Sequence, residues 1–218
     1  MYKRFFKRLI DLLICLVGLP FFLLAFVIFA PIIYLTDKGP VFYNAQRLGV
    51  DGKPFKMYKF RSMMVNAPDI RNADGSTYNG EDDPRVTKIG RLMRKTSVDE
   101  LPQFLNVLLG DMSLIGPRPD PLDDMLIYTE RQKTKLTVRP GITGYNQAYY
   151  RNGVEQNEKF ENDVFYAENI SFWLDVKIFF KTIITILAKD NVYNSASGLN
   201  EDAQQEVAQL KNGEKVAK

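Results

Sequence analysis

The sequence predicts an α-rich α+β membrane protein, and three observations support this fold class. A long apolar segment follows a basic N-terminus, two short alternating segments separated by a glycine-containing turn come next, and amphipathic helical segments make up most of the remainder. These features divide the chain into a membrane element over residues 1–36, a small domain over 37–190 and a polar C-terminal tail over 191–218.

The apolar segment runs from Leu12 to Tyr34, 23 residues without a charged side chain, and four basic residues precede it. A signal peptide has a shorter apolar core, of about 7 to 15 residues, and ends at a small-residue cleavage site. A straight helix of this length, at about 1.5 Å per residue, would just cross a hydrocarbon core of about 30 Å. The segment is therefore predicted to lie in a membrane, as a single span or as a re-entrant hairpin.

Charge and proline both bear on that choice. Basic residues lie on both sides of the segment, so the positive-inside rule does not place its two ends on opposite faces. Pro20 cannot donate to the carbonyl four residues earlier and its ring clashes there, which predicts a kink near Val17 to Leu19. A helix broken at Pro20 could enter one leaflet and return, and Pro31 offers a second possible break.

A β-hairpin is predicted after the membrane segment. Val41 to Tyr43 suits a short extended piece, and Arg47 to Lys53 contains the glycines of a hairpin turn. The alternation of basic and apolar residues from Phe55 to Phe60 is typical of a half-exposed strand. Residues 66–85 are polar and rich in Gly and Asp, which predicts a surface loop.

Helices are predicted over most of the remaining chain. Their ranges are 91–95, 101–109 ending at Gly110, 125–135, 157–167, 171–189 and a weak one over 201–210. Residues 116–119 must be rigid and non-helical, and 139–144 suits a turn. The helix over 171–189 has an apolar face with Phe and Trp and a polar face with Lys. It is either a core helix or an interfacial helix on the membrane, and its apolar face could also serve a homodimer.

The composition excludes several kinds of chemistry. The 218-residue chain has no His, so a Ser-His-Asp triad, a Cys-His dyad and a His-containing zinc site are all ruled out. Its single cysteine, Cys15, lies in the apolar run and cannot form an internal disulfide. Acid-base chemistry must therefore use carboxylates, Lys or Tyr.

The net charge of +3 is unevenly distributed. Residues 1–60 carry nine Lys or Arg and three Asp or Glu, while the rest of the chain is slightly acidic. The basic part is also the apolar part, and no basic stripe with interleaved aromatic residues is present. This pattern indicates an anionic membrane surface as a partner and argues against nucleic acid.

The densest group of candidate functional residues lies between Gly90 and Pro119. Asp99 and Glu100 stand between basic residues there and could have a purely structural role, because Ser97 to Glu100 matches a helix capping box. In either case both carboxylates lie at a helix N-terminus, where the helix dipole and nearby cations favour an ionised Asp99. Adjacent helical residues do not share a face, so separate roles are expected for the two.

An ionised and positioned Asp99 could attack phosphorus or bind Mg²⁺, which proteins commonly hold through one or two carboxylates plus substrate phosphates. Arg94 and Arg118 could neutralise diphosphate oxygens, since a guanidinium binds phosphate through two donors. The alternative for these arginines is an ordinary solvated surface position. Lys59 has the same alternative, because strand alternation alone would expose it.

The chain resembles the bacterial sugar transferase family of monotopic phosphoglycosyl transferases. The resemblance covers residues 3 to about 190 and rests on motifs that occur in order: KRLID (7–11), GPVF (39–42), MYKFRSM (57–63), RVTKIGRLMRKTSVDELPQFLNVLLGDMSLIGPRP (85–119), RPGITG (139–144) and NISFWLDVKI (169–178). The long central block is highly specific.

The resemblance implies transfer of a phosphosugar from a UDP-sugar to undecaprenyl phosphate, with release of UMP and with Mg²⁺ as cofactor, at the first membrane step of glycoconjugate or exopolysaccharide assembly. Asp99 would form a covalent phosphosugar intermediate, and Glu100 would complete an Asp-Glu dyad. Lys59, Arg94 and Arg118 match positions associated with substrate phosphates. Asp99 is also the expected metal ligand.

The family further implies a re-entrant N-terminal helix and a catalytic domain on the cytoplasmic face of the bacterial inner membrane. Many members have Ser-Pro at the helix break, whereas this chain has Leu19-Pro20. Two other functions remain open from the sequence. One is a membrane-bound nucleotide-sugar hydrolase that uses Asp99 with water as the acceptor, and the other is a non-catalytic scaffold that binds anionic membrane.

Overall fold

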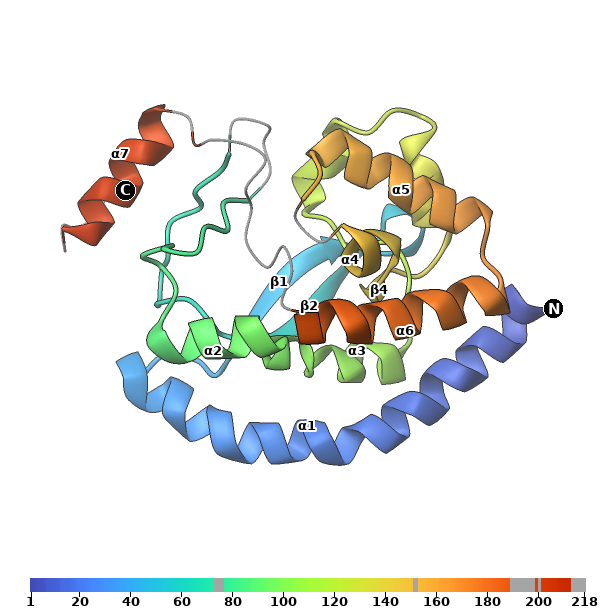
Figure 1. Ribbon diagram of the computed structural model, residues 1–218, viewed down its shortest axis with the longest axis horizontal. Helices are drawn as coiled ribbons and strands as arrows, with labels where there is room; N and C mark the ends of the chain where they lie inside the picture. The colour runs from blue at the N-terminus through green and yellow to red at the C-terminus, as the bar shows by residue number, and fades with distance from the viewer. Residues whose placement is uncertain (73–76, 151–152, 189–198, 200, 213–218) are drawn as a thin grey trace.

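The computed structural model describes residues 1–72, 77–150, 153–188, 199 and 201–212 (Figure 1). Helices dominate these residues, and two small two-stranded sheets lie among them. The α-rich α+β class predicted from the sequence is therefore confirmed. The long helix α1 (Lys7–Asp37), preceded by a π-helical turn over Tyr2–Phe6, curves beneath the rest of the molecule (Figure 1).

Helix α1 is continuous through both prolines. The predicted break at Pro20 is a bend in this structure, because a proline removes one helical hydrogen bond without ending the helix. Both prolines are exposed, and the buried side chains of α1 face the rest of the molecule. Among the described residues α1 is the one helix whose length and apolar composition suffice to cross a membrane.

Both ends of α1 are tied to the rest of the molecule. Lys7, at its start, forms an ion pair of 2.7 Å with the buried Asp175 of α6 (Phe172–Ala188). Near its end, the two carboxylate oxygens of Asp37 accept hydrogen bonds from both terminal nitrogens of the buried Arg61, at 2.5 and 2.6 Å. The whole length of the helix is thus held against one body.

The predicted hairpin is confirmed and is longer than expected. Strand β1 (Phe42–Leu48) pairs antiparallel with β2 (Pro54–Phe60) around a 3-10 turn over Val50–Gly52. Asp51 and Gly52 both have positive φ, which suits the Asp-Gly pair at a hairpin turn. Phe42 and Phe60 stack on Phe22 and Phe26 of α1 with ring centroids 5.7–6.5 Å apart, so this end of the hairpin lies on α1.

Residues 66–85 were predicted as a surface loop, and their described part has no helix or continuous strand. It is nevertheless anchored in the interior. Arg85 and Asp83 are both buried and form an ion pair of 2.8 Å, and Arg85 also donates to the carbonyl oxygens of Pro68 and Tyr78. This network fixes the path of a segment whose composition suggested mere solvent exposure.

Three helical segments follow: α2 (Lys88–Thr96), the 3-10 turn η3 (Val98–Glu100) and α3 (Gln103–Leu109). Thr87 caps α2 by accepting a hydrogen bond from the Gly90 amide at 3.0 Å. Gly110 ends α3 with a φ of 99°, as predicted. Helix α3 lies on the concave side of α1, with the Phe104 ring against Gly18, where a Cβ atom would come within 2.5 Å of it.

The second sheet was not predicted. Strand β3 (Ser113–Ile115) pairs parallel with β4 (Gly141–Thr143), which lies in the segment predicted as a turn. Asp11 of α1 accepts hydrogen bonds from the Ser113 hydroxyl at 2.7 Å and the Leu114 amide at 3.2 Å, which joins this sheet to α1. The Gly116–Pro119 connection is non-helical, as predicted.

The helix predicted over 125–135 is wrong. The structure has two 3-10 segments instead, η4 (Leu122–Leu126) and η5 (Gln132–Thr137). Thr129 and Gln132 exchange hydrogen bonds between their side chains and amides, at 3.0 and 3.2 Å, and this reciprocal contact starts a new helical turn. Short α4 (Tyr145–Tyr149) follows, and α5 (Gln156–Glu168) occupies the predicted polar helix.

Helix α6 exposes most of its apolar side chains and buries Asp175 and Ile178. Trp173 is 70% exposed, Phe180 60% and Leu187 75%, so most of the apolar face lies outside the core, while Ile178 packs into it. The weak helix predicted in the tail is confirmed as α7 (Glu201–Lys211), whose Val207 packs on Ile70. The remaining tail positions 191–198, 200 and 213–218 lie outside the described residues, and Lys189, the predicted end of α6, does too.

Candidate active site

Asp99, Glu100 and Lys59 meet at the junction of η3 and β2. The Lys59 ammonium lies 3.0 Å from Asp99 Oδ2 and 3.3 Å from Glu100 Oε1. The side chain of Asp99 is 3% exposed, whereas Lys59 and Glu100 are 20% and 25% exposed. A single cation from the strand therefore holds two adjacent carboxylates, one of which is buried.

The local backbone explains how two neighbouring carboxylates reach one ammonium. Ser97 ends α2 in the left-handed region with a φ of 57°, and its side chain makes no capping hydrogen bond. The predicted capping box is therefore wrong, and Glu100 turns to Lys59 instead. The tight 3-10 turn before α3 replaces the α-helical geometry on which separate faces for Asp99 and Glu100 were expected.

Asn106 fixes the position of β2 relative to α3. It is fully buried, its Oδ1 accepts a hydrogen bond from the Tyr58 amide at 2.9 Å, and its Nδ2 donates to the Lys56 carbonyl at 2.7 Å. These bonds hold the backbone of β2 at Lys56 and Tyr58, just before Lys59. Sequence reasoning missed Asn106, although a polar residue within the apolar run 101–109 was a usable signal.

One oxygen of Asp99 is left for a ligand. Asp99 Oδ2 is buried and accepts no hydrogen bond within the described part of the chain, although the Lys59 ammonium lies 3.0 Å away. Such an atom is uncommon, because buried acceptors are nearly always satisfied. Val98 and Leu101 on either side of Asp99 pack against the α1 cluster that contains Phe22 and Ile33. The carboxylate therefore lies one layer above α1.

The structure places Arg94 on the side of α2 that faces the loop before it. Its Nε donates to the Ser62 hydroxyl and its NH1 to the Asn79 side-chain oxygen, both at 2.9 Å. Ser62 follows β2 by two residues, so Arg94 lies beside the strand that carries Lys59. Arg94 is half-buried and fixed, in contrast to the solvated position that was the alternative.

Arg118 is exposed and lies in the non-helical connection after β3. It makes no hydrogen bond or ion pair within the described residues, and it acts electrostatically on Arg47 of β1. The next charged residue, Asp120, is buried and accepts hydrogen bonds from the Tyr128 hydroxyl at 2.6 Å and from the Lys135 ammonium. Thus the structure brings Lys59, Asp99 and Glu100 together and places Arg118 on a separately anchored loop.

Sequence reasoning also missed the cluster that anchors the Arg118 loop. Lys135 is buried between Asp120 and Asp163, and Asn146 donates to the second oxygen of Asp163 at 3.1 Å. The two carboxylates raise the pKa of the Lys135 ammonium against the opposing effect of burial. The sequence separation of the three charged residues left no local pattern by which to find them.

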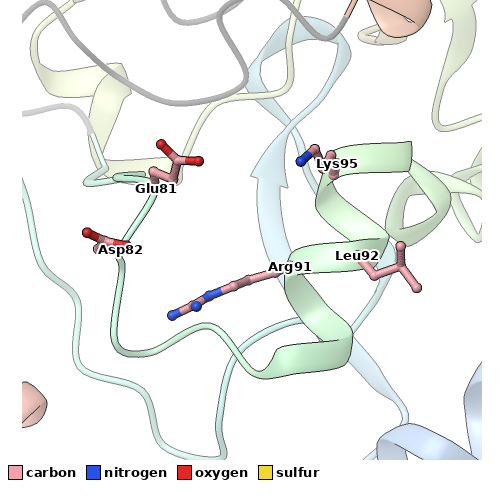
Figure 2. Close-up of a pocket in the computed structure, with 5 residues that line it drawn as sticks. All are labelled: Glu81, Asp82, Arg91, Leu92 and Lys95. Carbon is pink, nitrogen blue, oxygen red and sulfur yellow. The ribbon is translucent and has the colours of Figure 1, made fainter.

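A separate cavity of about 260 Å³ lies between α2 and the preceding loop (Figure 2). Arg91, Leu92 and Lys95 line it from α2, and Glu81 and Asp82 line it from the loop. None of the residues of the Lys59 contact belongs to it. The cavity is open to solvent and is lined by both acidic and basic side chains. It is therefore a solvated surface feature.

The donor set near Asp99 suits one kind of metal ion. The described residues contain no group of three or more Asp, Glu or Cys that could bind a metal by themselves. Asp99 and Glu100 supply two carboxylates, and Asp99 Oδ2 is buried without a hydrogen bond. Mg²⁺ fits such a set, because it usually binds one or two carboxylates and completes its shell with water and substrate phosphates.

Comparison with known proteins gives the family. The model of the bacterial sugar transferase family matches residues 2–189. The uncharacterized sugar transferase EpsL of Bacillus subtilis (strain 168) is 46% identical over 161 residues, which cover 74% of this chain and 77% of that protein.

Two further relatives have names that state a reaction. The undecaprenyl-phosphate galactose phosphotransferase of Salmonella typhimurium is 38% identical over 208 residues, covering 88% of this chain and 42% of that protein. The UDP-N-acetylgalactosamine-undecaprenyl-phosphate N-acetylgalactosaminephosphotransferase of Aeromonas hydrophila is 41% identical over 193 residues, covering 84% and 44%. The chain thus spans less than half the length of these two proteins. The family expected from the motifs is confirmed, and the chain belongs to the bacterial sugar transferase family.

Proposed function

We propose that this protein transfers a sugar phosphate from a UDP-sugar to undecaprenyl phosphate and releases UMP. The observation that carries the proposal is the buried Asp99 carboxylate, held by Lys59 and left with an oxygen that accepts no hydrogen bond, one layer above the apolar helix α1. The names of the Salmonella and Aeromonas relatives support the same reaction.

Asp99 acts as the nucleophile in this proposal. An Asp99 oxygen attacks the sugar-linked phosphorus, the bond from that phosphorus to the bridging oxygen breaks, and UMP leaves with the bridging oxygen. An oxygen of the lipid phosphate then attacks the acyl phosphate. The bond between phosphorus and Asp99 breaks, which restores the carboxylate and yields a lipid-linked sugar diphosphate.

Lys59 and Glu100 cover the nucleophile, because they are its neighbours and are more exposed than it is. An incoming phosphate would replace the carboxylates around the Lys59 ammonium, which frees Asp99 to attack and neutralises phosphate charge. Arg94 and Arg118 would bind substrate phosphates, since a guanidinium donates two parallel hydrogen bonds to them. Glu100 completes the dyad as a second carboxylate beside the reacting phosphate.

Mg²⁺ is the proposed cofactor, with Asp99 and Glu100 as its protein ligands. When bound, it would neutralise charge on the substrate diphosphate, as divalent ions do in phosphoryl transfer. Lys59 and the arginines perform the positioning steps described above independently of that ion.

The exposure of α1 supports a membrane location with both helix ends on one side. Most apolar side chains along α1 are exposed, and its two ends form ion pairs with Asp175 and Arg61 of the same body. A straight span would carry one end about 30 Å away from that body. We therefore propose a re-entrant arc in one leaflet of the bacterial inner membrane, with residues 37–190 on the cytoplasmic face.

Helix α6 supports the same placement. Its exposed face carries Phe172, Trp173 and Phe180, while Asp175 and Thr185 are buried. Burying apolar surface of this size in lipid is favourable, and Trp prefers the membrane interface. This arrangement favours the interfacial alternative for α6 over the core helix. Asp99 and both substrates would then lie at the boundary between an anionic bilayer and the cytosol.

The test is UMP release by the purified protein in lipid nanodiscs with Mg²⁺ and a panel of UDP-sugars, with and without undecaprenyl phosphate. We expect turnover with a particular sugar that requires the lipid phosphate and is lost in Asp99→Asn. Undiminished UMP release without the lipid would show a hydrolase. No turnover of any donor by the wild type, together with lipid binding that is unchanged in Asp99→Asn, would show a scaffold. Each of the last two results contradicts the proposal.

A further inference from the structure

Arg47 is a half-buried cation without a partner. Its side chain makes no hydrogen bond, ion pair or ring contact among the described residues, although it is only partly exposed on β1. Burial lowers the pKa of its guanidinium, and the neighbouring Arg118 charge acts in the same direction. A desolvated and unpaired charge is costly to keep, so the fold holds this side chain ready for an anion.

Arg118 lies beside Arg47 because two chain segments are joined there. The Leu48 amide, next to Arg47, donates a hydrogen bond of 2.9 Å to the carbonyl of Asp120, two residues after Arg118. The buried Lys135 and Tyr128 hold the Asp120 side chain. Both arginines are therefore carried by anchored backbone, and neither has an ion pair within the part of the chain that is described.

The nearby carboxylates do not neutralise this pair. Asp120 is occupied by Lys135 and Tyr128, as described above. Asp124 accepts a hydrogen bond from Gln156 at 3.1 Å, and burial raises its pKa to about 6. Neither carboxylate lies within ion-pair distance of Arg47, so two guanidinium groups remain available for a ligand.

We propose that Arg47 and Arg118 together bind a phosphate group of the nucleoside diphosphate donor. This inference rests on the proposed function and adds Arg47 as a donor-binding residue. Guanidinium groups are suited to the task because each offers a planar pair of donors that matches phosphate oxygens.

The direction of β1 favours the donor over the lipid phosphate. Strand β1 leads from the α1 side of the molecule toward α5 (Figure 1). Phe42, at the start of the strand, stacks on Phe26 of α1, and Leu48, at its end, belongs to the same buried cluster as Phe160 of α5. Tyr43 is the cross-strand partner of Lys59, and Arg47 follows it by four residues, about 13 Å further from α1. A water-soluble nucleotide reaching Asp99 from the cytosol would pass this point, whereas a lipid phosphate would approach from α1.

Arg47 and Lys59 lie on the same face of the hairpin, because side chains of directly paired residues and of every second residue share a face. One extended nucleotide could therefore lie along this face from Lys59 toward Arg47.

The experiment measures binding of UDP and of inorganic pyrophosphate to the full chain in nanodiscs by calorimetry, together with the melting temperature without ligand. The variants are Arg47→Met, Arg47→Lys and the control Arg131→Met. Arg131 is an exposed arginine that pairs with Glu161 and Glu168, so its removal changes the net charge equally.

We expect Arg47→Met to weaken UDP and pyrophosphate binding about 10-fold to 100-fold, as for loss of a hydrogen bond to a charged group. Its melting temperature should be equal to or above that of the wild type, because an unpaired charge is removed. Arg47→Lys should bind UDP and pyrophosphate with intermediate affinity, and Arg131→Met should bind them as the wild type does. In turnover assays, the KM of Arg47→Met for undecaprenyl phosphate should equal that of the wild type.

Unchanged UDP affinity with a lower melting temperature in Arg47→Met would overturn the inference and show a structural arginine. A raised KM for the lipid phosphate with unchanged UDP affinity would also overturn it, since the lipid would then be the anion. Failure of the proposed function would give a different result from failure of this inference. Wild-type protein that binds UDP through Arg47 but releases no UMP from any donor would retain the inference while contradicting the transferase assignment.

Discussion

At the scale of single residues, the burial of Asp99 sets the stability of the fold against catalytic activity. A buried carboxylate with an unsatisfied oxygen costs free energy, and Lys59 compensates part of that cost through an ion pair of 3.0 Å. Asp99→Asn should therefore leave the melting temperature unchanged or raised while it abolishes turnover. Asp123→Asn, at an exposed position on η4, is the matched control and should keep full activity. A large loss of stability in Asp99→Asn with residual activity would contradict this account.

Asp124 should make the stability of the protein depend on pH. Burial raises the pKa of Asp124 to about 6, above the value of about 3.9 for a free side chain, so the folded protein favours the protonated form. Ionisation therefore costs stability as the pH rises from about 4 to 6, and that cost persists above pH 6.

Asp124→Asn should consequently raise the free energy of unfolding by about 1 to 3 kcal/mol at pH 7.5 and change it little at pH 4. The Gln156 hydrogen bond can persist, because Asn retains an acceptor oxygen. Urea unfolding at the two pH values measures the difference, and Asp123→Asn is the control. Equal effects at both pH values would contradict the assignment of the cost to ionisation.

Part of the site could be predicted from residues alone. Asp99 and Glu100 stand out as adjacent carboxylates in a basic segment, and Lys59 lies in a recognisable motif. Arg47 and Asn106 could not be identified in this way, because their importance depends on partners that are far away in the sequence or missing. An unpaired arginine is a feature of packing and has no local signature, and the polar position of Asn106 within the apolar run 101–109 does not show what it binds.

At the scale of elements, Asn106 joins α3 to β2 and so positions Lys59 against Asp99. Asn106→Leu has a similar volume but leaves the Tyr58 amide and the Lys56 carbonyl without their buried partner. The expected loss is about 2 to 4 kcal/mol in the free energy of unfolding, since each unsatisfied buried group costs about 1 to 3 kcal/mol. Activity should fall with it, because the strand that carries Lys59 is released.

Chemical unfolding and UMP release measure the two effects in the same preparation. Asn44→Leu, at an exposed position of β1, is the control and should change neither quantity appreciably. Wild-type stability in Asn106→Leu would show that the hairpin is held to α3 by other contacts.

Elements with local signals were predicted and elements without them were not. The hairpin has alternation and an Asp-Gly turn, and α3 has an apolar run ended by Gly110. The β3–β4 pair joins three-residue strands across 25 intervening residues, so no short segment contains its pattern. The contact between Thr129 and Gln132 interrupts a segment whose composition alone favoured a continuous helix.

At the scale of the whole molecule, the ion pairs at both ends of α1 predict its membrane topology. A protein with Cys15→Ala as background, carrying Lys3→Cys or Lys38→Cys, places a single thiol at an exposed position before or after the apolar segment. A membrane-impermeant maleimide should label both positions from the cytoplasmic side. Labelling from opposite sides would contradict the re-entrant arc and show a simple span.

The sequence predicted a membrane segment but left its shape open, because prolines permit either a break or a bend. The curvature follows from packing on α3 and from the Lys7 and Asp37 ion pairs, which join residues distant in sequence. The orientation of α6 was ambiguous for the same reason. Its apolar face suits a core or a membrane equally well until the burial of Asp175 shows which side faces inward.

The most direct test of the central claim is the intact mass of the protein after incubation with its UDP-sugar and Mg²⁺ in the absence of lipid phosphate. We expect a mass increase of one sugar phosphate per chain, located by peptide analysis at Asp99. The adduct should disappear on addition of undecaprenyl phosphate and should be absent in Asp99→Asn. Lipid-dependent UMP release without any adduct, or an adduct that persists in Asp99→Asn, would contradict the role of Asp99 as the nucleophile.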